Sequence, residues 1–214
     1  MDEDIAIINR DTRNKKIKDF FVNNKKIIIV ILSLIIILIF GYFILKDINE
    51  KNKIKLSNQY NKAIVNFSSG DKTNIERELI NIINKKDKTY SPLALYFLID
   101  NNILEENKKI NDLFDILIEE TKLEKEIKNL IIYKKALFNS SFESENNLIE
   151  MLSPIINSES IWKSHGLYLM GEYFYSKNEN QKSKDFFDQI LILENANPKI
   201  KIETKKKLNR DFSE

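Results

Sequence analysis

IIIVILSLIIILIFGYFIL, residues Ile27 to Leu45, holds 19 consecutive positions without a charged side chain. As an α-helix this stretch would extend about 28 Å, close to the thickness of the hydrocarbon core of a bilayer. A buried helix of a soluble protein keeps a polar face, and this stretch has none. A cleavable signal peptide ends in a small-residue site, whereas this stretch ends in Phe40-Gly41-Tyr42-Phe43-Ile44-Leu45. We therefore expect an uncleaved transmembrane helix.

The charges on either side of the span indicate its orientation. The 15 residues before it carry six Lys and Arg residues, and the 15 after it carry four. Because the more basic flank usually stays in the cytoplasm, we expect a cytoplasmic N-terminus. The expected layout is a short cytoplasmic tail (1–26), a transmembrane helix (27–45) and a C-terminal domain in the periplasm, in a single-pass protein of a bacterial inner membrane. The opposite orientation, with the domain in the cytosol, stays open.

The composition excludes several kinds of site. The chain has 34 basic and 32 acidic residues, and its tail alone carries the excess positive charge, so we expect no nucleic-acid partner. With no cysteine, one histidine and four glycines, it lacks the residues for a thiolate or multi-histidine metal site and for a glycine-rich phosphate loop. We expect no enzyme, no catalytic residue, no metal and no cofactor. Carboxylate pairs such as Glu119-Glu120 are expected to be solvated helix ends.

After the span, the pattern predicts helices only. Apolar residues recur at helical spacing, and no Asn-Gly or Asp-Gly hairpin pair occurs. In the third helix, Ser91 is expected as the N-cap and Pro92 as the first helical position. A polar C-terminal helix or tail is expected over 199–214. The eight helices expected before it cover about 47–68, 74–84, 91–101, 110–119, 123–139, 145–152, 160–176 and 181–193.

Short polar turns join these helices into pairs, which suggests a repeat over residues 46–198. The segment from Ser164 to Asn197 fits the 34-residue tetratricopeptide pattern best. There Gly171 is the small residue that lets two helices approach, Phe187 is the aromatic residue of the second helix, and Ser183 is its small residue. Ala63, Ala94 and Ala136 fill the small-residue position of weaker units. The predicted fold class is all-α: one transmembrane helix, then a tetratricopeptide-like α-solenoid of about four helix pairs.

Such a stack presents a concave face built from the first helix of each pair. In the last unit, four residues fall at the positions that normally line this face: His165, Tyr168, Glu172 and Tyr175. Tyrosine offers apolar area and a hydrogen-bonding tip, so we predict a partner-binding surface there. The alternative is that these residues pack against the preceding helix pair. His165 and Glu172 are also the only pair that suggests proton transfer, although a groove histidine near a carboxylate is the simpler interpretation.

The layout resembles the YfgM-type ancillary subunits of the SecYEG translocon, which carry a tetratricopeptide-like domain. The matching stretches are the tail Asp11-Thr12-Arg13-Asn14-Lys15-Lys16-Ile17-Lys18-Asp19-Phe20-Phe21, the first unit Tyr60-Asn61-Lys62-Ala63 with Gly70-Asp71, and Gly171-Glu172-Tyr173-Phe174 in the last unit. Layout contributes more to this match than identity does, because family members have alanine where this chain has isoleucine, lysine and asparagine.

The resemblance implies a membrane-anchored protein-protein interaction module. Such a protein would link SecYEG to periplasmic chaperones, and its expected partners are the translocon, those chaperones, exported polypeptides and the lipid bilayer. A periplasmic scaffold for envelope assembly or cell division, without translocon contact, is the alternative.

Overall fold

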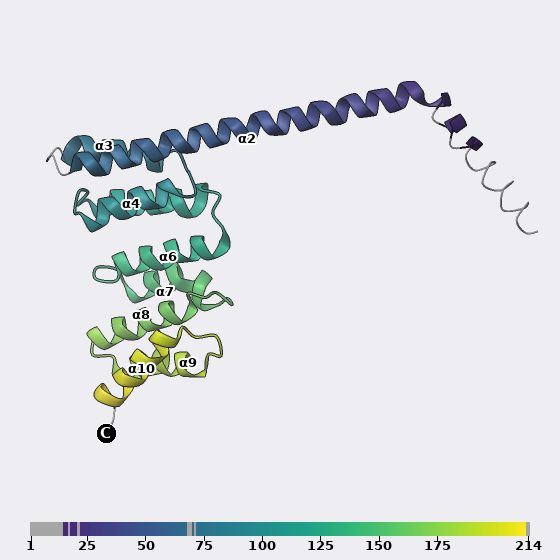
Figure 1. Cartoon of the computed structure of the whole chain (residues 1–214). Helices are drawn as coiled ribbons and strands as arrows, with labels where there is room; N and C mark the ends of the chain where they lie inside the picture. Colours follow the sequence, from purple (N-terminus) through teal and green to yellow (C-terminus); the bar gives the residue numbers. More distant parts are fainter. Residues whose placement is uncertain (1–14, 17, 21, 68–69, 71, 213–214) are drawn as a thin grey trace, which may run out of the picture. The chain divides into compact units, whose positions relative to one another are not determined.

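The computed structural model describes residues 15–16, 18–20, 22–67, 70 and 72–212, and every element in these ranges is a helix (Figure 1). The predicted all-α class is therefore confirmed for the described part. Residues 1–14, most of the expected tail, lie outside the described residues, as do Ser68 and Asp71. The chain forms two compact units, residues 1–55 and residues 56–214, which are described separately.

The first unit is dominated by helix α2, Lys25–Phe67, which is 43 residues long. This helix contains the whole apolar stretch, whose large side chains are exposed along its length. By length and composition, α2 is suited to cross a membrane. The helix expected over 47–68 is continuous with the apolar stretch, and its last turns belong to the second unit. Gly70, with φ of +90°, follows in a left-handed conformation that glycine adopts easily.

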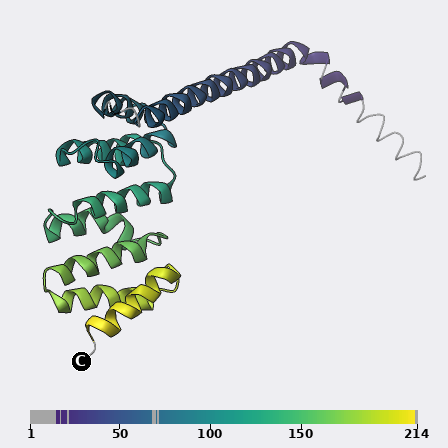
Figure 2. The ribbon, with the colours of Figure 1, turned by 60° about the vertical axis from the view of Figure 1, so that its left-hand side comes forward.

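The second unit is a series of helices in which neighbours along the chain pack on one another (Figures 1 and 2). The expected helices are all present, and most ends lie within a few residues of their predicted positions. The expected fourth helix ends in a π-helical turn, η1. The elements are α3 (Lys72–Ile83), α4 (Tyr90–Asp100), α5 (Asn107–Asp115), η1 (Ile116–Glu120), α6 (Lys125–Asn139), α7 (Glu145–Ile156), α8 (Lys163–Ser176), α9 (Asn180–Ile192) and α10 (Pro198–Asp211).

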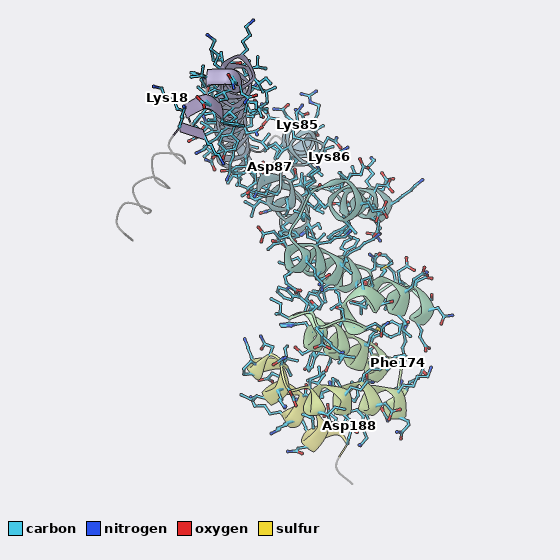
Figure 3. The ribbon with its side chains drawn as sticks, turned by 90° about the vertical axis from the view of Figure 1, so that its right-hand side faces the viewer. Lys18, Lys85, Lys86, Asp87, Phe174 and Asp188 are labelled. Atoms are coloured by element: carbon cyan, nitrogen blue, oxygen red, sulfur yellow. The ribbon has the colours of Figure 1, made fainter. Side chains whose placement is uncertain are left out.

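The prediction that Ser91 caps the third helix is wrong. Helix α4 begins at Tyr90, and Asp87, in the turn after α3 (Figure 3), accepts hydrogen bonds from the N–H groups of Thr89 and Tyr90 at 2.8 and 2.7 Å. Ser91 is fully buried, and its hydroxyl donates to the Ile82 carbonyl at 2.9 Å. An aspartate therefore satisfies the free N–H groups, and the serine ties α4 to the end of α3.

The four small residues singled out in the sequence are all buried. In three helix pairs, a second buried residue follows the small one after twelve positions: Ala63 with Ile75, Ala136 with Leu148, and Gly171 with Ser183. In the pair α4–α5, the buried residue Ile110 follows Ala94 after sixteen positions instead of twelve, because the intervening turn is longer. A buried small residue followed by a second buried residue on the next helix thus recurs along the chain.

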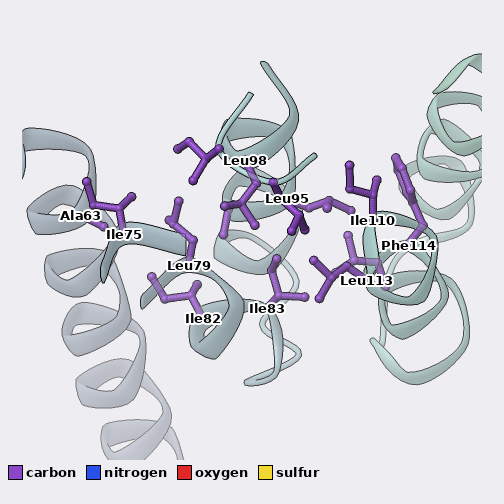
Figure 4. Close-up of a cluster of buried hydrophobic side chains, with 14 of the residues drawn as sticks. Ala63, Ile75, Leu79, Ile82, Ile83, Leu95, Leu98, Ile110, Leu113 and Phe114 are labelled. Carbon is purple, nitrogen blue, oxygen red and sulfur yellow. The ribbon is translucent and has the colours of Figure 1, made fainter. Parts of the chain in front are cut away.

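Apolar side chains from successive helices form the core. The first cluster joins the end of α2 to α3, α4 and α5, and Figure 4 shows Ala63, Ile75, Leu79, Leu95 and Phe114 among its members. A second cluster joins α6, α7 and α8, and a third joins α8, α9 and α10. Ile118 of η1 contacts both of the first two clusters, so η1 lies where they meet. No pair buries its apolar face alone, and stability depends on neighbouring pairs.

Candidate protein-interaction site

The four predicted partner-binding residues lie on α8, and all four are half-buried. The structure divides them into two groups. One group contacts the end of the chain: Tyr168 contacts α9, Glu172 contacts α10, and Tyr175 contacts Phe212, which follows α10. His165, in contrast, contacts α6. The role of the four residues in binding a partner stays a prediction.

Helix α10 and the residue after it occupy the surface around Glu172 and Tyr175. Lys207, only 9% exposed, places its Nζ 3.0 Å from Glu172 Oε1 and 3.9 Å from the centre of the Tyr175 ring. The Tyr175 ring also lies 5.7 Å from that of Phe212. A cation held between a carboxylate and an aromatic face fixes α10 on α8.

Tyr168 packs in the same region, with its ring centre 5.4 Å from that of Phe187. Burial, together with the negative charge and hydrogen bonding of Glu172, raises the pKa of Tyr168 to about 12. The phenol therefore stays protonated at neutral pH and is suited to donate a hydrogen bond. These three residues pack against α9, α10 and Phe212, whereas His165 contacts Tyr133 of the preceding pair, which is the packing that the sequence alternative proposed.

His165, nearer the start of α8, lies in an aromatic cluster with Trp162 and Tyr133. Its ring centre is 4.9 Å from that of Trp162 and 5.7 Å from that of Tyr133 on α6. Within the described chain its Nδ1 is buried without a hydrogen-bond partner, and burial lowers the pKa of the imidazole. Glu172 accepts instead from Lys207 at 3.1 Å, and among the described residues no hydrogen bond joins it to His165, its proposed proton-transfer partner.

A hydrogen-bond network fixes this aromatic cluster to α6. Glu126 accepts from the Ser160 hydroxyl at 2.8 Å through its carboxylate, and its backbone carbonyl accepts from the Trp162 indole N–H at 3.0 Å. Asn129 donates to the Ser160 hydroxyl at 3.0 Å. Each partner comes from the start of α6 or from the turn before α8. Trp162 therefore serves the interface between two helix pairs.

A groove of about 370 Å³, which no sequence pattern had singled out, lies between η1 and α7, with α6 beneath it. Its apolar lining is Ile118, Ile132, Met151 and Pro154, and its polar lining is Asp115, Glu119, Lys135, Asn147 and Glu150. Glu119 was expected only as a solvated helix end. The available signal was the spacing of Asn147, Glu150, Met151 and Pro154, which places them on one face of α7.

Among the described residues, no group of three or more His, Asp, Glu or Cys side chains is arranged to hold a metal ion. The chain matches no known protein-family model, no curated protein and no solved structure.

Proposed function

We propose that the chain is a membrane-anchored protein-protein interaction module with a tetratricopeptide-like domain. The observation that carries the proposal is the recurring buried pair, a small residue followed by a second buried residue on the next helix, as in Gly171 and Ser183. Proteins built from such helix pairs expose long surfaces between their helices, and these surfaces bind peptides or partner helices. Helix α2 supplies the membrane anchor.

The proposed topology is a cytoplasmic tail, one span and a periplasmic domain. The basic residues before the span favour this orientation. Because the chain contains no cysteine, one introduced cysteine reports its side of the membrane. Asn180→Cys, at the exposed start of α9, should react with an impermeant maleimide in intact spheroplasts, whereas Lys16→Cys should react only after lysis. The reverse pattern overturns the orientation.

The finer proposal is an ancillary role at the SecYEG translocon, passing emerging polypeptides to periplasmic chaperones. It rests on the resemblance in the tail, in the first unit and around Gly171. The physical mechanism is tethering. A span that holds the domain beside the exit of the translocon raises its effective concentration near emerging chains, so that weak contacts suffice.

Co-purification tests this role. The tagged full-length chain is extracted in gentle detergent, and the proteins that accompany it are identified by mass spectrometry. The control replaces residues 27–45 with an unrelated apolar span of equal length. Translocon subunits that are retained by the natural chain and lost with the control support the ancillary role. Recovery of envelope-assembly or division proteins with both chains supports the scaffold alternative instead.

A further inference from the structure

The groove between η1 and α7 combines an apolar lining with several carboxylates. Its volume of about 370 Å³ falls in the usual range of ligand sites, roughly 300–1,000 Å³. Ile132 of α6 and Ile118 of η1 give it an apolar base, and Met151 and Pro154 extend that base along α7. An apolar base of this size accepts one or two aliphatic side chains.

Two irregular features of the backbone adjoin the groove. The π-helical turn η1 widens the end of the expected fourth helix, and the Thr121 hydroxyl closes it by donating to the Ile116 carbonyl at 3.1 Å. Such turns are rare and are often found at functional sites. Opposite it, Pro154 lies inside α7 and has no N–H, so the Glu150 carbonyl lacks its usual helical donor. Glu150 therefore offers a backbone acceptor as well as a carboxylate.

The rim of the groove is negative. Three carboxylates line it, those of Asp115, Glu119 and Glu150, against the single cation of Lys135. Lys135 is already paired with Asp115, at 2.5 Å. Glu119 and Glu150 form no ion pair with any described residue. The rim thus keeps two uncompensated negative charges beside an apolar base, which is complementary to a cationic and apolar occupant.

We propose that this groove binds polypeptide segments in which aliphatic side chains stand next to arginine or lysine. The aliphatic side chains occupy the base formed by Ile118, Ile132 and Met151, and the cation reaches Glu119, Glu150 and the free carbonyl. This inference rests on the proposed interaction function and specifies the segment that its helical domain selects. Because the carboxylates are on the rim, binding weakens as salt screens them.

Fluorescence anisotropy on the full-length chain in a non-ionic detergent tests the proposal. The probe is a labelled nine-residue peptide with a Leu-Leu pair flanked by arginines. Two matched peptides carry glutamate for the arginines or serine for the leucines. We expect the first peptide to bind at least ten times more tightly than each of the other two. Equal binding of all three peptides overturns the proposal.

Variants locate the binding. The double substitution Glu119→Gln and Glu150→Gln should weaken binding about tenfold, because it removes both unpaired charges and keeps the side-chain shape. The matched control is Glu105→Gln with Glu194→Gln, two exposed glutamates outside the groove lining, which should bind as the natural chain does. Circular dichroism checks that both variants stay folded. Equal weakening by the two doubles, or by neither, overturns the assignment to the groove.

The failure of this inference is distinguishable from failure of the proposed function. If the same partners co-purify with the natural chain and with the Glu119→Gln, Glu150→Gln variant, and no peptide binds, the groove proposal is overturned and the proposed function is not. Peptide binding without any co-purifying partner overturns the proposed membrane role alone. Light scattering tests a third outcome. A dimer that the Glu119→Gln, Glu150→Gln substitution dissociates, and that the control substitution does not, identifies a second copy of the chain as the occupant. That result overturns the peptide proposal.

Discussion

The ring of Phe187 on α9 lies so close to Gly171 on α8 that a β-carbon on the glycine would stand 2.5 Å from the ring edge. Both residues are buried, and Phe187 is fully enclosed. The Ser183 hydroxyl joins the same two helices by donating to the Gly171 carbonyl at 2.8 Å. The absence of a side chain at position 171 thus sets the distance between α8 and α9.

Gly171→Ala should destabilise the second unit. The added methyl group overlaps the Phe187 ring, which has no room to move in a packed core, and overpacking of this kind costs about 1–3 kcal/mol. Thermal unfolding of the full-length chain in detergent, followed by circular dichroism, should show a lower midpoint. Gly41→Ala is the matched control, because a β-carbon there has no neighbour within 4 Å. An unchanged midpoint for Gly171→Ala contradicts the close approach.

Ser91→Ala should also destabilise the chain, by about 1–3 kcal/mol. The substitution leaves the Ile82 carbonyl, the acceptor of the buried serine hydroxyl, without that donor. It also removes the acceptor of the Asp87 N–H, at 2.9 Å. Urea unfolding is the measurement, and Ser176→Ala, an exposed serine on α8, is the control. Similar midpoints for the two variants would contradict the buried hydrogen bonds of Ser91.

The helices and the close approach at Gly171 were predictable because they depend on local pattern. Apolar spacing marks a helix, and a small residue amid large ones marks a helix contact. Local pattern also predicted, wrongly, that Ser91 is the N-cap of the third helix. The stronger acceptor, Asp87, lies four residues earlier, and the serine hydroxyl finds a carbonyl on the preceding helix that sequence cannot place nearby.

The candidate surfaces were less predictable because they depend on contacts between distant segments. Nothing local to Glu172 indicates that Lys207, 35 positions later, pairs with it. The groove needs the π-helical turn at Ile116–Glu120 and one face of α7 to lie on either side of it, with α6 beneath. Helical periodicity predicts each of these faces but not their neighbours.

The stability of the chain should depend on pH through His165. Burial lowers the pKa of this imidazole in the folded state below its ordinary value of 6.5, so the unfolded chain binds a proton more readily. The free energy of unfolding should therefore be constant above about pH 6.5 and fall as the pH drops towards the folded pKa. His165→Phe, which keeps a ring beside Trp162, should lose this dependence.

The measurement for His165 is direct because the chain contains one histidine. Every imidazole signal in a carbon-detected or proton-detected NMR titration belongs to it. The folded chain should titrate below pH 6.5, and the urea-unfolded chain near 6.5. A folded pKa at or above 6.5 contradicts the buried position beside Trp162 and Tyr133.

Lys207→Met should loosen α10. Methionine keeps much of the aliphatic length, but Glu172 and Asp211 lose the ammonium group that lies 3.0 and 3.4 Å from their carboxylates, and Tyr175 loses the cation over its ring. Because Glu172 stays 38% exposed, water replaces part of this interaction, and we expect a loss of about 1–2 kcal/mol. Hydrogen exchange should rise in α10 before it rises in α9. Lys205→Met, on the exposed face of α10, should leave exchange unchanged. Equal exchange in both variants means that apolar packing by Ile200 and Leu208 holds α10 without the buried lysine.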